Sequence, residues 1–304
     1  DDEGSPPGAR EAVRSLSELG VEAMIGHTIS STSVATLDLI NEKKMVTITP
    51  TATADELRGK DDYLFTLPSS NRELARKAAD FALHELDVER MSVVLDHSNK
   101  AYTENFLASF SEFFEASGGR VVSEHAYRSD AFQHFEQLIV EALSQDPRAI
   151  LVLAPSLDTA MVVQQLYKMR QPIPVVAGDW ASSRELILQG GPYVKNVYHT
   201  NVLRSSSQSE AFLAFEERYR MRFTDTPSNG GALGYEAATI ILDALRIRAE
   251  NSGGGPEELK EILLNRSFDG LEESLSFDRF GDIQRSIYIK KVKSNRFVDV
   301  PFGE

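Results

Sequence analysis

Residues 26–53 read GHTISSTSVATLDLINEKKMVTITPTAT. An apolar run at residues 21–25 leads into this stretch and a second run at 45–48 lies within it, and small hydroxyl residues follow each run. Between the runs, residues 34–40 place apolar side chains at the spacing of one helix face. The pattern predicts two parallel strands joined by a helix. Their carboxyl ends would share one edge of a sheet, which is where open α/β sheets bind ligands.

The hydroxyl residues Ser30 to Ser33 are expected at the start of the connecting helix. Unpaired backbone N–H groups and the helix dipole favour an anionic group at such a position. The stretch therefore indicates a pocket that holds a small carboxylate without a formal positive charge. The alternative interpretation is ordinary N-capping and turn chemistry, for which Ser and Thr are commonly used.

Strand and helix patterns alternate along most of the chain, which is typical of a parallel sheet with helices on both faces. Ser5 is expected to cap a first helix, and Gly20 to end it. The expected strands are residues 21–25, 45–49, 91–95, 120–126, 149–153, 174–177 and 194–199. The expected later helices are residues 71–87, 101–117, 131–145, 157–170, 183–190, 208–223, 231–250 and 256–265. The tail, residues 275–299, alternates like antiparallel strands around a turn at Gly281-Asp282.

Composition limits the classes of function. The 304 residues carry 32 Lys and Arg against 46 Asp and Glu, and a net charge of -14 disfavours nucleic acid as a partner. No apolar run is long enough to insert in a membrane. The absence of cysteine excludes disulfides and thiolate metal sites. The six histidines lack the paired spacing of a metal site, so we expect neither a metal nor a cofactor.

Five segments in sequence order resemble the leucine/isoleucine/valine-binding protein family, a group of type I periplasmic solute-binding proteins of ABC transporters. The resemblance is carried by GHTISSTS at 26–33, TPTATADEL at 49–57, DHSNKAY at 96–102, GYEAA at 234–238 and FDRFGD at 277–282. It covers essentially the whole chain. The first segment is the most specific of the five.

The resemblance implies an α/β protein with two doubly wound lobes joined by a three-crossover hinge. Lobe one would be residues 1–69 and 204–283, and lobe two would be 70–203 and 284–304. A ligand would lie in the cleft between the lobes, and hinge closure would bury it. By the same comparison, we expect that a strand–helix unit of lobe one, which precedes the counterpart of Asp1 in the family, is missing from this sequence.

In lobe one, the resemblance implies that the Ser30 hydroxyl and nearby N–H groups hold the ligand carboxylate. Thr53 would add a hydroxyl, and Thr51 would contact the ligand partly through its backbone. Thr28 and Ile29 depart from the more apolar pair that the family usually has just before the serines, which affects side-chain selectivity. Tyr235 resembles the aromatic residue that lines the side-chain end of the pocket, although core packing explains it equally well.

In lobe two, Tyr102 resembles an aromatic residue that packs on the ligand, and packing within its own lobe is the alternative. Asp179 and Trp180 follow a predicted strand, where the family places an acid that pairs with the ligand ammonium. Either Asp179 is that acid, or Trp180 has replaced it and the pocket prefers an aromatic or non-amino carboxylate. Ser156 stands where the family often has a larger aromatic residue, which would leave extra room.

We therefore expect a periplasmic or extracytoplasmic receptor that captures a small carboxylate, an apolar or aromatic amino acid or a close relative, and delivers it to a membrane permease. The main alternative is a ligand-sensing domain of the same fold in a receptor or amide-type regulator. A sugar-binding relative would need several Asp, Asn and Arg side chains in place of the Ser and Thr residues. No G-x-S-x-G motif or phosphate-binding loop supports an enzyme.

Overall fold

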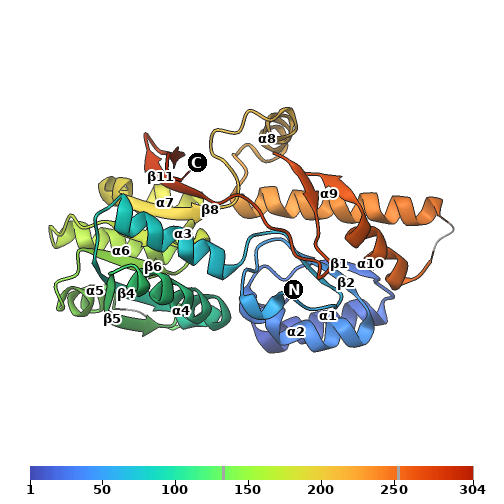
Figure 1. Ribbon diagram of the computed structural model, residues 1–304, viewed down its shortest axis with the longest axis horizontal. Coiled ribbons are helices and arrows are strands. Elements are labelled where there is room, and N and C mark those ends of the chain that lie inside the picture. Colours follow the sequence, from blue (N-terminus) through green and yellow to red (C-terminus); the bar gives the residue numbers. More distant parts are fainter. Residues whose placement is uncertain (132–133, 252–253, 304) are drawn as a thin grey trace. The chain divides into compact units, whose positions relative to one another are not determined.

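The computed structural model describes residues 1–131, 134–251 and 254–303 (Figure 1). Contacts within the chain divide it into two compact units. Unit 1 comprises Asp1–Ser70 and Ser207–Arg285, and unit 2 comprises Asn71–Ser206 and Ser286–Glu304.

Each unit is assembled from separate stretches of the chain, with divisions after Ser70, Ser206 and Arg285. The lobe boundaries expected from the sequence were placed after residues 69, 203 and 283. The interpretation of the two units as lobes that close on a hinge stays a prediction.

Unit 1 contains a parallel sheet of strand order β1-β2-β3 and a separate antiparallel pair, β9 with β10. Its elements are α1 (Pro6–Glu18), β1 (Ala23–Ile25), α2 (Ser30–Lys43), β2 (Val46–Thr49), η1 (Asp55–Leu57), β3 (Leu64–Thr66), α8 (Glu210–Phe223), α9 (Asn229–Glu250), α10 (Pro256–Asn265), β9 (Ser267–Asp269) and β10 (Ser274–Ser276). Ile25 pairs with Ile48 in register, which confirms the two parallel strands predicted from residues 21–48.

Unit 2 contains a seven-stranded sheet of order β12-β11-β8-β7-β6-β4-β5, in which β11 and β12 run antiparallel to their neighbours. Its helices are α3 (Asn71–His84), η2 (His97–Asn99), α4 (Lys100–Ala116), α5 (Phe135–Leu143), α6 (Ser156–Lys168), η3 (Asp179–Ala181), α7 (Arg184–Gln189) and η4 (Gly191–Asn196). Its strands are β4 (Arg90–Asp96), β5 (Arg120–Tyr127), β6 (Ala149–Leu153), β7 (Val175–Ala177), β8 (Val197–Asn201), β11 (Tyr288–Lys293) and β12 (Arg296–Val300).

The central sheet of unit 2 is buried on both faces. Ile150 and Val152 belong to one hydrophobic cluster, which takes its helical members from α5, α6 and α7. Leu151 lies between them in β6, points to the opposite face and is also fully buried. Buried phenylalanines of α3 and α4, including Phe81 and Phe106, supply apolar side chains for that second face. The prediction of helices on both faces is confirmed for this unit.

The sheet of unit 1 is covered in the same way. One cluster joins β2 and β3 to α9 and α10, with Ile48 and Phe65 as fully buried strand members. A second cluster joins α1 and α2 to β1, where Met24 and Ile40 are buried. The carboxyl ends of β1 and β2 are thereby held side by side between two helical layers.

The predicted first helix is confirmed together with both of its boundaries. Ser5 is the N-cap of α1, and its hydroxyl accepts a hydrogen bond from the Gly8 N–H at 3.1 Å. After the last turn Gly20 has a φ of +74°, which favours glycine because it has no Cβ.

The prediction for the tail is wrong in its strand pairing. The antiparallel hairpin is β11 with β12, and its turn is Ser294-Asn295, with φ values of 50° and 58°. Such two-residue turns match the twist of a hairpin. Gly281-Asp282 joins no pair of strands; instead, Asp282 forms a bridge with Thr66 of β3. Alternation of residue types in the tail did not identify which turn joins the paired strands.

Other strands also differ from the sequence-based expectation. β3 and β9, of three residues each, were not predicted. The strand expected at 194–199 begins at Val197, since Gly191–Asn196 forms the 3-10 helix η4 with a proline in its first turn.

In the described part of the chain, no helix is both long and apolar enough to cross a membrane.

Candidate functional site

The predicted hydroxyl edge of unit 1 forms where the loops after β1 and β2 meet. Ser30 is the first residue of α2 and is only 2% exposed. Its Oγ accepts hydrogen bonds from the backbone N–H groups of Thr53 at 3.1 Å and Ala54 at 3.3 Å. A hydroxyl has two acceptor positions and one donor. Ser30 therefore ties the two loops together and still has a proton to donate.

Two further threonines connect the same loops. The Thr49 hydroxyl donates to the carbonyl of His27 at 2.7 Å, and the Thr51 hydroxyl donates to the carbonyl of Thr28 at 2.8 Å. The Thr51 hydroxyl proton is therefore already used in a hydrogen bond. Thr51 could contact a ligand only through its backbone or through its hydroxyl oxygen as an acceptor. Thr53 is 1% exposed and lies against Ser30 through its N–H. The structure brings Ser30, Thr51 and Thr53 together.

Ile29 is the N-cap residue of α2 and has an extended backbone. Its side chain cannot cap the helix, while its carbonyl accepts hydrogen bonds from the hydroxyls of Thr32 at 2.8 Å and Ser33 at 3.1 Å. The positive end of the α2 dipole is therefore not neutralised by an acidic or hydroxyl N-cap. Such a helix start, together with the Ser30 hydroxyl, offers the hydrogen-bond donors and the positive potential that a carboxylate needs.

Tyr235 packs against α8. Among the described residues, no contact joins it to the Ser30 edge. Its ring packs on Phe215 with centroids 4.7 Å apart, and Arg218 donates to its hydroxyl at 2.9 Å. The start of α9 does approach the edge, because a Cβ on Gly230 would lie 3.8 Å from Thr51 Cγ2. The contacts of Tyr235 with Phe215 and Arg218 thus support the packing interpretation.

In unit 2, Tyr102, Asp179 and Trp180 lie together at the carboxyl edge of the sheet. The Tyr102 hydroxyl donates to Asp179 Oδ1 at 3.1 Å, and its ring meets Trp180 edge-on with centroids 5.7 Å apart. Tyr102 is 3% exposed. It lies on α4, after β4, and reaches across the end of β6 to the residues that follow β7.

The close approach of Tyr102 depends on Gly178, which the sequence analysis did not identify. A Cβ at Gly178 would lie 1.8 Å from the Tyr102 hydroxyl oxygen, so no other residue fits there without moving the tyrosine. The signal in the sequence was a glycine placed directly between a buried strand and Asp179. Its role became visible only with the position of Tyr102, which is distant in the chain.

Burial raises the pKa of Asp179 to about 6, and hydrogen bonds from Tyr102 and from backbone N–H groups partly offset this increase. Burial and the neighbouring carboxylate also raise the pKa of Tyr102 well above its ordinary value, so the phenol stays protonated and donates. Asp179 is a buried carboxylate, and no cationic side chain among the described residues forms an ion pair with it. A ligand ammonium would supply the missing charge.

Ser156 has a mainly structural contact. It is the first residue of α6, is 4% exposed, and its Oγ accepts a hydrogen bond from the Ser183 N–H at 3.0 Å. It thereby fastens the loop after β7, which carries Asp179, to the end of β6. Ser156 lies at the same edge of the sheet as Tyr102, Asp179 and Trp180, but no contact with these three residues is seen among the described residues.

A second polar network at this edge was not predicted. Asp96 ends β4 and is fully buried, and it accepts hydrogen bonds from the N–H groups of Ser98 at 2.8 Å and Ser129 at 3.0 Å. Next to it along the sheet, Tyr127 donates to Asp158 at 2.6 Å. Burial raises the pKa of Asp158, and the bond from Tyr127 opposes that effect. These groups satisfy one another and fix the loops around α4.

Among the residues that the structure describes, no group of three or more His, Asp or Glu side chains could hold a metal ion. The two groups of predicted residues, Ser30 with Thr51 and Thr53, and Tyr102 with Asp179 and Trp180, belong to different units. Each group lies after the carboxyl ends of parallel strands, as predicted.

Comparisons with known proteins agree with this architecture. A family model described as "Periplasmic binding protein" matches residues 1–296. The Leu/Ile/Val-binding protein homolog 3 of Brucella melitensis biotype 1 is 19% identical over 286 residues, which cover 93% of this chain and 76% of that protein.

Solved structures give the same fold over 99% of this chain. The leucine-binding protein LivK of Thermotoga maritima MSB8 matches with a TM-score of 0.89 at 25% identity, covering 99% of this chain and 85% of that one. A solute-binding protein of an ABC transporter from R. palustris, solved in complex with benzoate, also has a TM-score of 0.89. It is 18% identical and covers 99% of this chain and 82% of its own.

Proposed function

The chain belongs to the periplasmic binding protein family and has its type I fold, and on this basis we propose that it is the substrate-binding protein of an ABC transporter. The proposed solute is a small carboxylate: an amino acid with an apolar or aromatic side chain, or an aromatic acid. The two classes follow from the relatives, one of which is named for leucine while another was solved with benzoate.

The observation that carries the proposal is the state of the Ser30 hydroxyl. Both of its acceptor positions are taken by backbone N–H groups, which fixes the oxygen and aims its proton away from them. It lies on the first turn of α2, whose N-cap side chain is apolar. A carboxylate at this point would accept the Ser30 proton and meet the positive end of the helix dipole.

Asp179 supports an amino acid as the solute. Its carboxylate has a phenol and backbone donors as partners, with no cation among the recorded contacts. An α-ammonium group would form a charge-assisted hydrogen bond with it, which is stronger than a bond between neutral groups. The zwitterion would then be held at the carboxylate by unit 1 and at the ammonium by unit 2.

Trp180 supports an aromatic acid as the second candidate. Its ring and that of Tyr102 form an edge-to-face pair beside Asp179. An aromatic solute would add a third ring, with a gain of about 0.5–1.5 kcal/mol beyond burial of its area. In that case Asp179 serves to orient Tyr102 and contacts no ammonium.

The proposed mechanism is hinge closure. Unit 1 engages the carboxylate first, and unit 2 then brings Tyr102 and the Asp179 loop over the solute, so that only the closed form presents the surface that a membrane permease recognises. An extracytoplasmic location follows from the family to which the chain belongs. A ligand-sensing domain would bind the same solutes but would not stimulate a permease, which ATPase assays with the reconstituted transporter distinguish.

A calorimetric and thermal-shift screen of ligand-stripped protein tests the proposal. The panel contains the twenty amino acids, their deaminated acids, benzoate-type acids and simple sugars. A ligand at ~100 times its dissociation constant should stabilise the protein by about 2.7 kcal/mol. Ser30→Ala should abolish binding of every responsive acid.

Thr36→Val is the matched control, because it removes a fully buried hydroxyl from the same helix away from the edge. It should lower stability and leave affinity unchanged. Responses to sugars alone, or equal losses of affinity in the Ser30 and Thr36 variants, would contradict the carboxylate site.

A further inference from the structure

Two asparagines of unit 2 are completely buried although their amides are strongly polar. Asn71 and Asn201 are both 0% exposed, and no other asparagine among the described residues is buried to that degree. Burial of an amide costs free energy unless the amide is hydrogen-bonded. The partners that offset this cost show which segments each side chain holds in place.

Asn71 holds the backbone of Tyr102. It is the first residue of α3 and of unit 2. Its Nδ2 donates a hydrogen bond of 3.0 Å to the carbonyl of Tyr102, which is 31 residues further along the chain. Tyr102 in turn donates to Asp179 and packs against Trp180. The Asn71 side chain thus links the point where the chain enters unit 2 to a predicted solute contact.

Asn201 holds η3, the turn that begins at Asp179 and includes Trp180. It is the last residue of β8, shortly before the chain leaves unit 2. Its Nδ2 donates to the Ser182 hydroxyl at 2.9 Å, and its Oδ1 accepts from the Leu203 N–H at 2.9 Å. The Ser182 N–H donates to the Asp179 carbonyl at 3.0 Å, which closes the turn. One amide therefore joins this turn to the departing segment.

The segment by which the chain returns to unit 2 adjoins the same asparagine. The chain returns at Ser286, and Tyr288 of β11 lies opposite Asn201 in the strand register. The Arg204 guanidinium lies over the Tyr288 ring, 4.6 Å from its centroid. Together, the two asparagines thus adjoin all three segments at which the chain passes between the units, near residues 70, 206 and 285.

We propose that Asn71 and Asn201 are positioning residues for the solute contacts of unit 2. Asn71 acts through the Tyr102 backbone, and Asn201 acts through Ser182 on the turn with Asp179 and Trp180. Each fixes its part of the group to a segment that joins the units, so a displacement of that segment displaces the group. The inference rests on the proposed function, which gives this group a solute to hold.

Trp180 is the single tryptophan of the chain, so its fluorescence reports on this group without a label. Asn71→Leu and Asn201→Leu remove the amides and keep side chains of similar shape. Each should shift the Trp180 emission and increase its quenching by acrylamide in the folded, solute-free chain. Asn71→Ala and Ser182→Ala break the same two hydrogen bonds without adding bulk, and they should reproduce the two effects.

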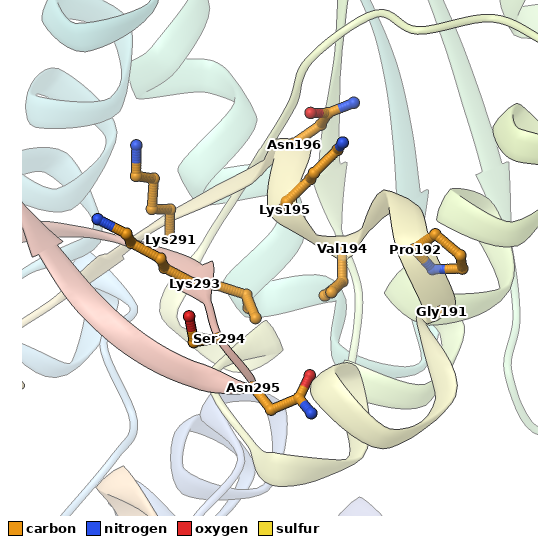
Figure 2. Close-up of a pocket in the computed structure, with 10 residues that line it drawn as sticks. Gly191, Pro192, Val194, Lys195, Asn196, Lys291, Lys293, Ser294 and Asn295 are labelled. Atoms are coloured by element: carbon orange, nitrogen blue, oxygen red, sulfur yellow. The ribbon is translucent and has the colours of Figure 1, made fainter.

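Two variants of unit 2 are the controls. Asn196→Leu makes the same replacement just before the other end of β8, where Asn196 lines a cavity between η4 and the β11–β12 hairpin (Figure 2). Ser92→Ala removes a fully buried hydroxyl that donates to the Ala142 carbonyl at 2.7 Å. Ser92→Ala should lower the stability to urea, and both controls should leave the Trp180 spectrum of the folded chain unchanged.

The link to the departing segment is tested with Asp299→Ala. The Asp299 carboxylate accepts hydrogen bonds from the N–H groups of Ser205 at 2.9 Å and Ser206 at 3.1 Å, so its removal loosens this segment from β12. The resulting shift of Trp180 emission should disappear in the Asn201→Leu background. A shift of equal size in both backgrounds would show that Asn201 does not transmit the displacement.

Calorimetric titration with leucine and benzoate completes the comparison. Affinity should fall about threefold to tenfold in Asn71→Leu and Asn201→Leu, as expected for loss of one hydrogen bond, and should be unchanged in the controls. If neither acid binds the unmodified chain, the proposed solutes are wrong, while the fluorescence comparison still decides the role of the asparagines. Unchanged Trp180 spectra in both asparagine variants, or an equal change in Ser92→Ala, would overturn the positioning role.

Discussion

Arg285 donates two hydrogen bonds to the carboxylate of Glu236, at 2.6 and 3.3 Å, and the two side chains are 0% and 1% exposed. Glu236 also accepts a bond from the Leu271 N–H at 2.8 Å. The backbone of Arg285 meets Ser69, whose hydroxyl donates to the Arg285 carbonyl at 3.0 Å. This buried pair thus anchors the two segments at which the chain leaves unit 1, at residues 70 and 285, to helix α9.

Replacement of Glu236 by Gln should destabilise unit 1 strongly. It removes the negative charge from a guanidinium that remains buried, and breaking one partner of such a pair costs about 3–5 kcal/mol. Urea unfolding, followed by circular dichroism, measures the loss. Glu216→Gln is the matched control, because its pair with Arg220 is on the surface and should contribute less than about 1 kcal/mol. Similar losses in the two variants would show that burial does not set the strength of the Glu236 pair.

Gly178→Ala should displace Tyr102, since the new Cβ would lie 1.8 Å from the phenol oxygen. Overpacking of this kind costs about 1–3 kcal/mol. Tyr102→Phe removes the clashing oxygen, so the double variant should recover part of the loss. A double-mutant cycle of unfolding free energies measures this coupling. Simple additivity of the two changes would contradict the contact.

Asp179→Asn should alter the pH dependence of stability between about pH 4 and 6. The pKa of Asp179 is about 6 in the folded chain against an ordinary value of 3.8. In this interval the folded protein keeps a proton that the unfolded chain has released, so its stability falls as pH rises and is constant above the interval. The variant should lack this decrease when unfolding is measured across the range. Asp61→Asn is the control, because Lys260 lowers the pKa of Asp61 and its slope has the opposite sign.

The same pKa predicts how an amino acid would bind. Only ionised Asp179 pairs with an ammonium, so affinity for the amino acid should fall about tenfold per pH unit below 6. An aromatic acid without an amino group should not follow this trend. Calorimetric titration of both ligand classes from pH 4.5 upward, at about constant ionic strength, separates them.

Trp180→Ala should discriminate between the two candidate solutes. Loss of the ring beside Tyr102 removes an aromatic contact of about 0.5–1.5 kcal/mol for a ring-bearing ligand. An aliphatic amino acid should lose less, and its dependence on Asp179 should remain. Competition assays with leucine and benzoate measure the ratio. An unchanged ratio would mean that Trp180 only packs within unit 2.

The sequence predicted the parallel architecture well because both sheets depend on apolar periodicity, which is a local property. Strands such as β6 and helices such as α10 were found at their observed bounds. β3 and β9 were missed, and the tail hairpin was misassigned because alternation does not reveal the partner strand. The antiparallel register of β11 is set by contacts with β8, which is far away in the chain.

For the candidate site, residue type, strand-end position and the family resemblance together predicted Ser30, Thr53 and Asp179 as ligand contacts, and these roles stay predictions; the structure places each of the three after the end of a parallel strand. The sequence could not supply the hydrogen bonds and close contacts of each side chain. That the Thr51 proton is already donated to Thr28, and that Tyr102 requires Gly178, follows from contacts between distant segments. Tyr235 illustrates the opposite case, because its resemblance to a ligand contact gave no sign of its packing on Phe215.

The hydrogen bonds of Ser30, Thr49 and Thr51 that join the loops after β1 and β2 have a kinetic consequence. Two loops held in one arrangement have little conformational entropy left to lose, so a carboxylate arriving at unit 1 would not have to wait for them to order. Association with unit 1 would then be limited by diffusion and by desolvation of the carboxylate. Variants that remove these hydrogen bonds should therefore lower the rate of the first binding step before they weaken the final complex.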